Sequence, residues 1–241
     1  TRVTVSGPRS GSVLRNSSIA ETIGILSSAV SRDGIILMVN VTTTRLTLLH
    51  VRMSSRASVV LHNSVIQRST YGAAVSITQS DLTDAFFAVS ATNITDDVLY
   101  EINSRPSVIE FGAAAILRNA TVVISDCVVT GKRSNNAIFF EANVIRPWSC
   151  VAILGRNSLF LTPMASALVM VTFQENVTLL WQRSDLQQHL APIASAKTNI
   201  VAPHASDLVY TDDADVASQV AMSSPKATVV AELPPASAPC S

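Results

Sequence analysis

The stretch from Ile116 to Gly131 reads ILRNATVVISDCVVTG and decides the fold class. Its valines and isoleucines are typical of β-strands, because β-branched side chains pack well on a pleated surface. Two polar residues, Asn119 and Asp126, interrupt the apolar run, and each stands two positions after a large aliphatic residue. Asn tolerates the left-handed backbone conformation, so we expect Asn119 to turn the chain at a corner and Asp126 to hold the matching place in the next strand.

The same pattern recurs along the chain as a loose internal repeat. Its form is an aliphatic residue, any residue, Asn or Asp, two more residues and another aliphatic, and it occurs at positions 14–19, 61–66, 117–122 and 124–129. Successive asparagines follow one another at intervals of roughly 23 to 33 residues, the length of one supersecondary unit. These are Asn16, Asn40, Asn63, Asn93, Asn119, Asn143 and Asn176. Short strands with no helix between them predict repeats that stack as a solenoid.

The fold class that we expect is therefore all-β, a right-handed parallel β-helix with a less regular C-terminal segment. A leucine-rich repeat is a poorer match, because its leucine frame does not recur and the apolar positions are mostly Val and Ile. A β-sandwich is the main alternative. The presence of only eight glycines is an argument against tight corners.

The chain divides into three segments by composition. Residues 1–182 carry the expected coils of a longer solenoid, and residues 183–222 form a cap or an irregular segment. Within that segment Ser184–Ala196 is predicted to form a short helix that covers the end of the solenoid. Residues 223–241 are rich in Pro, Ala and Ser and are interpreted as a linker. The first residues resemble no signal peptide, so we interpret the chain as a piece of a longer protein or as a processed form.

Composition excludes several classes of function. The 17 basic and 17 acidic residues cancel, which argues against nucleic acid as a partner. The apolar runs are far shorter than the roughly 18 residues needed to span a bilayer, so this segment is not expected to be transmembrane, and any membrane anchor lies outside it. The four histidines have no metal-ligand spacing, and we expect no metal and no cofactor.

Five asparagines stand in Asn-x-Ser/Thr sequons and are candidates for glycosylation: Asn16, Asn40, Asn93, Asn119 and Asn176. The alternative is a structural role, in which an asparagine at a corner stacks on the asparagine of the next coil. We favour this structural role for Asn16 and Asn119 because they lie inside the repeat. The two roles exclude each other, since a stacked amide cannot also carry a glycan. Asn93 is the best candidate acceptor, because its surroundings are predicted to form an exposed loop.

Two of the three cysteines are a candidate disulfide. Cys127 follows Asn119 by eight residues, and Cys150 follows Asn143 by seven. If these asparagines mark one corner, the cysteines lie nearly above one another, and a strand spacing of ~4.8 Å brings their Cα atoms within disulfide range. The alternative is a pair of buried thiols. Cys240 has no evident partner in the sequence.

Paired carboxylates are the feature to seek in an enzyme that cleaves polysaccharide, because that reaction needs an acid and a base or nucleophile. Two adjacent pairs are present, Asp96-Asp97 and Asp212-Asp213. Both pairs stand in polar sequence, where adjacent acids are usually solvated. Asp96 and Asp97 are the best catalytic candidates that the sequence offers, and they are weak ones.

Three motifs resemble a known family: VVLHNSVIQRS at 59–69, VVISDCVVTG at 122–131 and NAIFFEANVI at 136–145. They are similar to the degenerate repeats of pectate-lyase-like right-handed β-helix proteins, and in particular to the dispersed gene family surface proteins of trypanosomatid parasites. The resemblance covers residues 13–180 and rests on aliphatic patterning with Asn or Asp. It implies a glycosylated β-helix at the cell surface or secreted, with an adhesive role.

We therefore expect a structural and adhesive module that binds a host or matrix glycan or protein without turnover. A β-helix carbohydrate-active enzyme, either a polysaccharide lyase or a glycoside hydrolase, is the alternative. The calcium-binding and catalytic motifs of such enzymes are absent from the sequence, and this favours the binding module.

Overall fold

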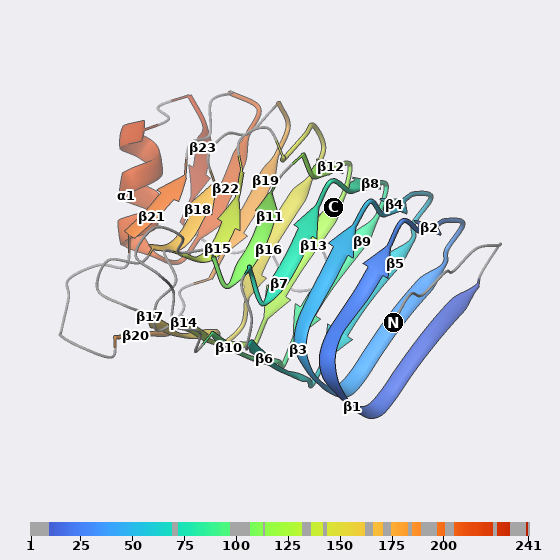
Figure 1. Ribbon diagram of the computed structural model, residues 1–241. Helices are drawn as coiled ribbons and strands as arrows, with labels where there is room; N and C mark the ends of the chain where they lie inside the picture. Colours follow the sequence, from blue (N-terminus) through green and yellow to red (C-terminus); the bar gives the residue numbers. More distant parts are fainter. Residues whose placement is uncertain are drawn as a thin grey trace.

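The computed structural model describes thirteen parts of the chain: residues 10–68, 72–96, 107–112, 114–131, 136–141, 144–161, 166–170, 175–182, 185–188, 197–200, 205–223, 226–231 and 240. Most of these residues belong to β-strands, and the described residues contain one α-helix. Apart from β1 (Gly11–Leu26) and β3 (Ile35–Leu49), the strands are short, because polar corners interrupt the apolar runs every few residues (Figure 1). The all-β class predicted from the sequence is confirmed.

The elements follow the chain in this order: β1 Gly11–Leu26, β2 Ala29–Val30, β3 Ile35–Leu49, β4 Arg52–Met53, β5 Ser58–His62, β6 Val65–Arg68, β7 Val75–Thr78, β8 Asp81–Thr83, β9 Phe86–Ser90, β10 Asn93–Asp96, β11 Ile109–Gly112, β12 Ile116–Arg118, β13 Thr121–Ser125, β14 Val128–Gly131, β15 Asn136–Phe140, β16 Cys150–Leu154, β17 Ser158–Leu161, β18 Ser166–Met170, β19 Thr178–Trp181, β20 Asp185–Gln188, β21 Lys197–Ile200, β22 Leu208–Thr211, α1 Ala214–Ser223 and β23 Thr228–Val230.

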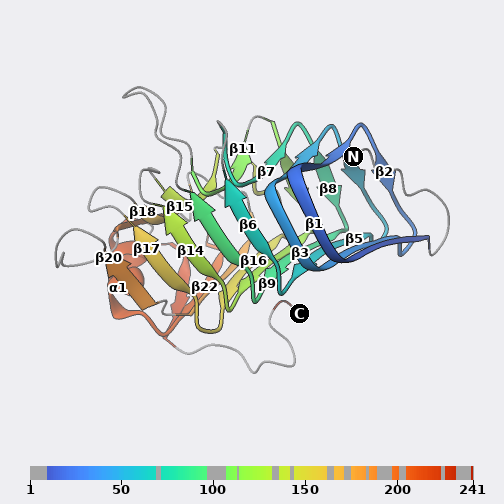
Figure 2. The ribbon, with the colours of Figure 1, turned by 60° about the horizontal axis from the view of Figure 1, so that its bottom comes forward.

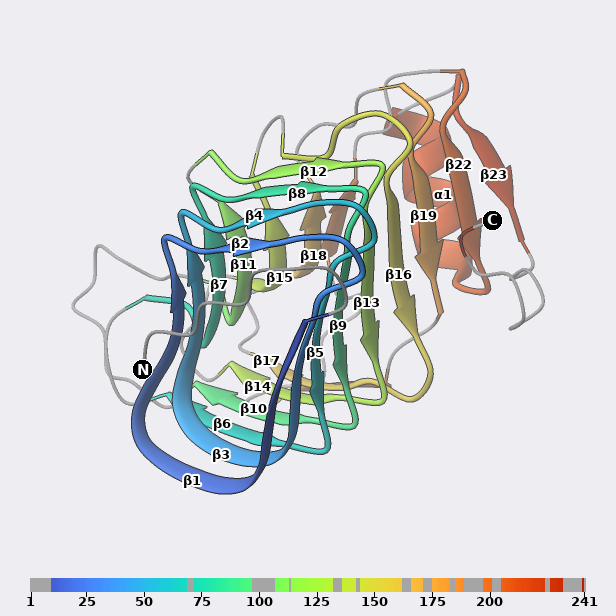
Figure 3. The same ribbon diagram turned by 90° about the vertical axis from the view of Figure 1, so that its right-hand side faces the viewer.

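Each strand pairs with a strand one repeat away, and every pairing among the described residues is parallel. The pairings form four rows (Figure 3). Row 1 holds β5, β9, β13, β16, β19, β22 and β23; row 2 holds β6, β10, β14, β17 and β20; row 3 holds β7, β11, β15, β18 and β21; row 4 holds β2, β4, β8 and β12. This arrangement agrees with the predicted parallel strands and not with a β-sandwich of antiparallel strands.

We call one passage of the chain through the rows a rung. The long strand β3 shows how a rung bends: its first part pairs with β5 in row 1, its middle with β6 in row 2 and its last part with β7 in row 3. The long strand β1 pairs with β3 along almost its whole length. Figure 2 shows β1 and β3 at one end of the molecule and α1 at the other.

The core lies between the rows, where alternate side chains of each strand point inward. Valine, isoleucine and leucine fill most of it, and three phenylalanines meet within it: Phe87 of row 1 and Phe111 of row 3 in one rung, and Phe140 of row 3 in the next. The rings of Phe87 and Phe111 meet edge to face with centroids 5.7 Å apart, and those of Phe111 and Phe140 stack at 4.5 Å. Such ring pairs add stabilisation beyond the area that they bury.

Residues other than glycine make most of the corners. Among the described residues, 17 non-glycine residues have a positive φ, whereas only Gly72 and Gly155 do so among the glycines. All four copies of the repeated motif place their Asn or Asp in this left-handed region, since φ is 47° at Asn16, 46° at Asn63 and at Asn119, and 54° at Asp126. The low glycine content is therefore compatible with tight corners, because Asn and Asp occupy positions that glycine often takes elsewhere.

The corner between rows 1 and 2 carries an asparagine ladder. Asn40 donates from Nδ2 to Oδ1 of Asn16 at 2.9 Å, and Asn63 donates in the same way to Asn40 at 2.7 Å. The predicted stacking of Asn16 on the asparagine of the next rung is confirmed. Ala91 and Asp126 continue the same corner, since Asn63 N donates to Ser90 O and Ala91 N donates to Ser125 O.

The corner between rows 4 and 1 forms a second column. Its backbone hydrogen bonds link Asp33, Arg56, Asp84, Asn119, Trp148 and Asn176, or the residue just before each, from rung to rung. Asn119 therefore belongs to a different corner from Asn16. On the next rung its backbone N–H donates to Pro147, and not to the predicted partner position at Asn143. Asn143 itself lies outside the described residues. Asn93 lies within β10 and not at a corner or in the predicted loop, because Ala91 takes the corner position.

The C-terminal part differs from the prediction in two respects. Asp185–Gln188 form β20, which pairs with β17, and not the predicted helix; the rest of Ser184–Ala196 lies outside the described residues. The helix is instead α1, which packs against β21, β22 and β23. The parallel rows therefore extend beyond residue 182, where the sequence predicted the coils to end, and β23 places residues 228–230 in the sheet rather than in a linker.

Two substitutions at the first corner test the role of the ladder. Asn40→Ala removes the two ladder hydrogen bonds and puts alanine at φ 53°, so we expect a loss of about 1–2 kcal/mol in the free energy of unfolding. Ala91→Asn, at φ 48° in the same column, is expected to raise stability by up to about 1 kcal/mol. Urea unfolding of both variants measures the effects, and equal stability of all three proteins would contradict the structural role of the ladder.

Candidate functional site

Asp96, one of the two catalytic candidates from the sequence, lies in the core at the end of β10. It pairs with Arg68 at the end of the neighbouring strand β6, with Nη2 to Oδ1 at 2.8 Å, and both side chains are fully buried. Burial lowers the pKa of Arg68, and the Asp96 carboxylate partly offsets this effect. A carboxylate enclosed in such a pair has no access to a substrate, so this geometry argues against Asp96 as a catalytic residue. Asp97 lies outside the described residues.

The second acidic pair, Asp212-Asp213, directly precedes the helix α1. The Asp213 carboxylate accepts a hydrogen bond from the backbone of Val216 through Oδ1, and its Oδ2 accepts one from the indole nitrogen of Trp181, each at 3.4 Å. These contacts are those of a helix N-cap, which satisfies a free N–H group of the first turn. Asp213 therefore has a structural role, and Asp212 is exposed beside it.

The structure brings together a different pair of carboxylates, Glu110 of β11 and Glu141, which directly follows β15. Both approach Gly112: Glu110 Oε1 lies 2.8 Å and Glu141 Oε2 lies 3.4 Å from the position that a Cβ on this glycine would occupy. A side chain at residue 112 would therefore collide with Glu110. The absence of a side chain leaves room for the two acids to converge.

Arg45 completes this cluster. Burial raises the pKa of Glu110, the nearby Glu141 carboxylate raises it further, and the Arg45 guanidinium acts in the opposite direction. Burial also lowers the pKa of Arg45, against the attraction of Glu110. The Arg45 guanidinium lies against Gly72, which has φ 97° and whose missing Cβ would come within 2.6 Å of Nη2. The cluster joins two acids and one base from three rungs.

Sequence reasoning missed this cluster because it searched for acids that are adjacent in the chain. Glu110 and Glu141 are 31 residues apart, which is one repeat, and each stands beside a phenylalanine that points into the core. A search for acids separated by about one repeat length, and not only for adjacent ones, would have found them. The pairing of Glu110 with Phe139 places Glu141 two residues further along the neighbouring strand.

The sequon asparagines occupy different environments. The Nδ2 atoms of Asn40 and Asn119 are engaged, the first with Asn16 and the second with the carboxylate of Asp84. Asn93 is exposed on β10, and its Oδ1 accepts a hydrogen bond from the hydroxyl of Thr95. The backbone of Asn176 donates to Ser206. Since a glycan attaches to Nδ2, Asn93 stays the best candidate acceptor, and its glycosylation stays a prediction.

The cysteine pairing expected from the sequence is wrong. Cys150 forms a disulfide with Cys240, and Cys127 is a free, buried thiol. The register explains the difference: Cys150 pairs with Thr121 on the neighbouring strand, whereas the backbone of Cys127 donates to the side chain of Asn157. Cys127 therefore lies one corner further along the rung than the disulfide. Burial raises the pKa of its thiol to about 11.

An apolar hollow of about 200 Å³ opens between β1 and β3 at the end of the rows. Its lining includes Val13, Leu14, Ile23, Ile25 and Met38, with no charged residue. It is the end of the core, where no described strand pairs with the outer edge of β1. The hollow carries no groups for acid–base chemistry.

Comparison with protein-family models, with curated proteins and with solved structures finds no match to this chain. Among the residues that the structure describes, no three His, Cys, Asp or Glu side chains gather as ligands for a metal ion. The same residues include no helix that is long and apolar enough to cross a membrane.

The buried ion pair makes a specific prediction. Asp96→Asn removes the carboxylate charge beside the buried Arg68 guanidinium, so we expect the free energy of unfolding to fall by about 3–5 kcal/mol. The double variant Arg68→Met/Asp96→Leu removes both charges and is expected to recover much of this loss. The matched control is Asp33→Asn, which breaks the exposed pair with Arg56 and is expected to cost about 1 kcal/mol or less. Denaturant unfolding gives the values; equal losses for Asp96→Asn and Asp33→Asn would contradict the assignment.

The cysteine assignment predicts a labelling pattern. The folded, unreduced protein is expected to resist iodoacetamide, because the Cys127 thiol is buried and its pKa is raised to about 11. Unfolding without reductant should then give one label at Cys127, as read by peptide mass spectrometry. Label at Cys150 or Cys240 under these conditions is the contrary result.

Cys240→Ser is expected to lower the free energy of unfolding by about 2–4 kcal/mol, since the disulfide with Cys150 closes a long loop.

Proposed function

We propose that this chain is an extracellular surface module, folded as a right-handed parallel β-helix, that binds a host or matrix glycan or protein without turnover. The observation that carries the proposal is the set of parallel rows, in which exposed side chains of successive rungs align in columns. Repeat proteins of this kind use such extended faces to bind partners. The proposal includes a relationship to pectate-lyase-like β-helix proteins and to the trypanosomatid dispersed gene family.

The surface or secreted location rests on two features. A disulfide between Cys150 and Cys240 persists in an oxidising compartment and is rare in the cytosol. The sequon at Asn93 is exposed on β10, where an oligosaccharide could be attached without disturbing the core. Both features are typical of secreted proteins.

Row 2 offers a face of the kind that an adhesive module needs. Its outward positions alternate with buried ones, and Val65, Gln67, Asn93 and Val128 are exposed on three neighbouring strands. Apolar and hydrogen-bonding groups are mixed on this face, as they are in most non-obligate binding surfaces. A rigid backbone presents them, so little conformational entropy is lost on binding.

The test measures binding and turnover together. The full chain, secreted from eukaryotic cells, is passed over immobilised matrix proteins and over arrays of neutral and acidic oligosaccharides. We expect saturable binding to at least one probe, an unchanged probe mass after long incubation, and a glycopeptide at Asn93. No saturable binding to any probe, or cleavage of the bound probe, would overturn the proposal.

The Glu110–Glu141 pair favours a second candidate function, a β-helix enzyme that acts on polysaccharide. An acid with a raised pKa beside a second carboxylate is the arrangement that glycosidic cleavage uses. In this case Glu110 would donate the proton to the leaving oxygen, and Glu141 would serve as base or nucleophile. Arg45 would bind an acidic group of the substrate.

Substitution of the two acids tests this candidate. Glu110→Gln and Glu141→Gln should each abolish the release of reducing ends from a polysaccharide panel, whereas Glu175→Gln, an exposed control, should leave it unchanged. Wild-type activity should fall as pH rises through the raised pKa of Glu110, because the acid must be protonated to act. Release of reducing ends that is indifferent to both substitutions would exclude this site.

A further inference from the structure

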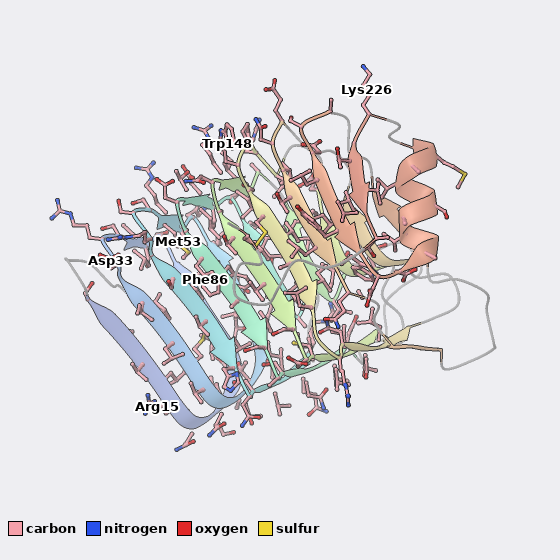
Figure 4. The ribbon with its side chains drawn as sticks, turned by 180° about the vertical axis from the view of Figure 1, so that it is seen from behind. Arg15, Asp33, Met53, Phe86, Trp148 and Lys226 are labelled. Carbon is pink, nitrogen blue, oxygen red and sulfur yellow. A yellow bond between two sulfur atoms is a disulfide. The ribbon has the colours of Figure 1, made fainter. Side chains whose placement is uncertain are left out.

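Trp148 is an exposed aromatic residue at a corner. It lies in the turn before β16, in the column between rows 4 and 1, and 67% of its surface is accessible to solvent. The other tryptophan of the chain, Trp181, is buried and donates its indole N–H to Asp213. Figure 4 places Trp148 on the outer edge of the molecule, with its side chain directed away from the core.

The backbone of Trp148 is in an unfavourable conformation for its residue type. Its φ is 66°, in the left-handed region that glycine and asparagine occupy readily and that costs a bulky residue free energy. The other residues of this column with a positive φ include Asp33, Asp84, Asn119 and Asn176, which tolerate it better. Strain of this kind is a known mark of functional sites. The side chain is exposed, so packing in the core does not account for the tryptophan.

The neighbours of Trp148 on this column are polar. The column residues on the preceding rungs interact in pairs: Arg56 with Asp33 at 2.7 Å, and the amide of Asn119 with the carboxylate of Asp84. The backbone N–H of Trp148 donates to Asn176 on the next rung, and that of Asn119 donates to Pro147. With rungs ~4.8 Å apart, the six positions span about 24 Å. One aromatic ring thus stands in a straight ridge of amides, carboxylates and a guanidinium.

We propose that this ridge binds a glycan, with a hexose ring stacked on Trp148 and hydroxyl groups bonded to the flanking Asn119 and Asn176. A pyranose has a face of C–H groups and an edge of hydroxyls, so it needs an aromatic surface beside amides and carboxylates. Hydroxyls both donate and accept hydrogen bonds, as the amide side chains do. The proposal rests on the proposed binding function and adds to it the site and the class of ligand.

The composition of the ridge favours a glycan over other partners. A protein hot spot is surrounded by contacts that exclude water, whereas the flanking column residues are hydrophilic, with Asn119 exposed and Asn176 half-buried. The straight, rung-by-rung spacing also suits a linear polymer of sugars.

The test uses Trp148→Asn. Asparagine adopts the left-handed region at φ 66° more readily than tryptophan does, so the melting temperature of this variant is expected to equal or exceed that of the wild type. Any loss of binding can then not be ascribed to unfolding. Trp148→Phe keeps an aromatic face and serves as the conservative variant. Met222→Asn, which removes another exposed apolar side chain at the far end of the molecule, is the matched control.

Binding of fluorescently labelled hexose oligomers, neutral and acidic, is measured for the four proteins. We expect Trp148→Asn to weaken binding roughly tenfold or more, Trp148→Phe to retain most of it, and Met222→Asn to have no effect. Bound oligomer should also shield Trp148 from iodide quenching, while the emission of buried Trp181 stays unchanged.

The outcomes separate the two proposals. Binding of an oligomer that is equal in Trp148→Asn and the wild type overturns the Trp148 site and leaves the binding function standing. Binding to matrix proteins but to no oligomer likewise overturns the Trp148 glycan site and leaves the binding function standing. Cleavage of an oligomer that still depends on Trp148 for binding supports the site and overturns the function without turnover.

Discussion

Parallel backbone hydrogen bonds between one rung and the next hold the strands of this protein in register. This register requires the corners of successive rungs to align as well. A corner can stack on the corner of the next rung only if both turn the chain at the same position in the rung and with the same backbone conformation. The left-handed residues meet this condition, and they recur at matching places in successive rungs. In the first column the side chains add a ladder of amides, so the same residues that turn the chain also tie the rungs together.

The apolar core and the buried charges depend on this register. Phe111 and Phe140 stack because β11 and β15 pair them directly in row 3, and Phe87 of row 1 in the same rung as Phe111 meets that ring edge to face. Arg68 and Asp96 neutralise one another for the same reason, since β6 and β10 place them side by side. A shift of one residue between these strands would separate the two charges and turn apolar side chains toward water. The ion pair thus favours one register, at the cost of desolvating both groups.

The outer surface carries the features on which function is inferred. Glu110 and Glu141 converge over Gly112, where the absence of a Cβ makes room for them, and Trp148 stands exposed on a polar ridge. The first feature suits acid–base chemistry and the second suits recognition of a sugar ring. They lie on different parts of the rung, between rows 3 and 4 and between rows 4 and 1. The substitutions that test one are therefore independent of those that test the other.

The sequence by itself determined the all-β class, the approximate repeat length and the corner residues of the four motif copies, because β-branched runs and the tolerance of Asn and Asp for left-handed geometry are local properties. It predicted that Asn16 would stack on the next rung, and this is correct. Only the tertiary structure decided which corner each asparagine occupies, since repeats of unequal length place Asn119 and Asn16 in different columns. The bond between Cys150 and Cys240, the burial of Asp96 with Arg68 and the convergence of Glu110 with Glu141 depend on that register. No residue's immediate neighbours in the chain determine how successive rungs align.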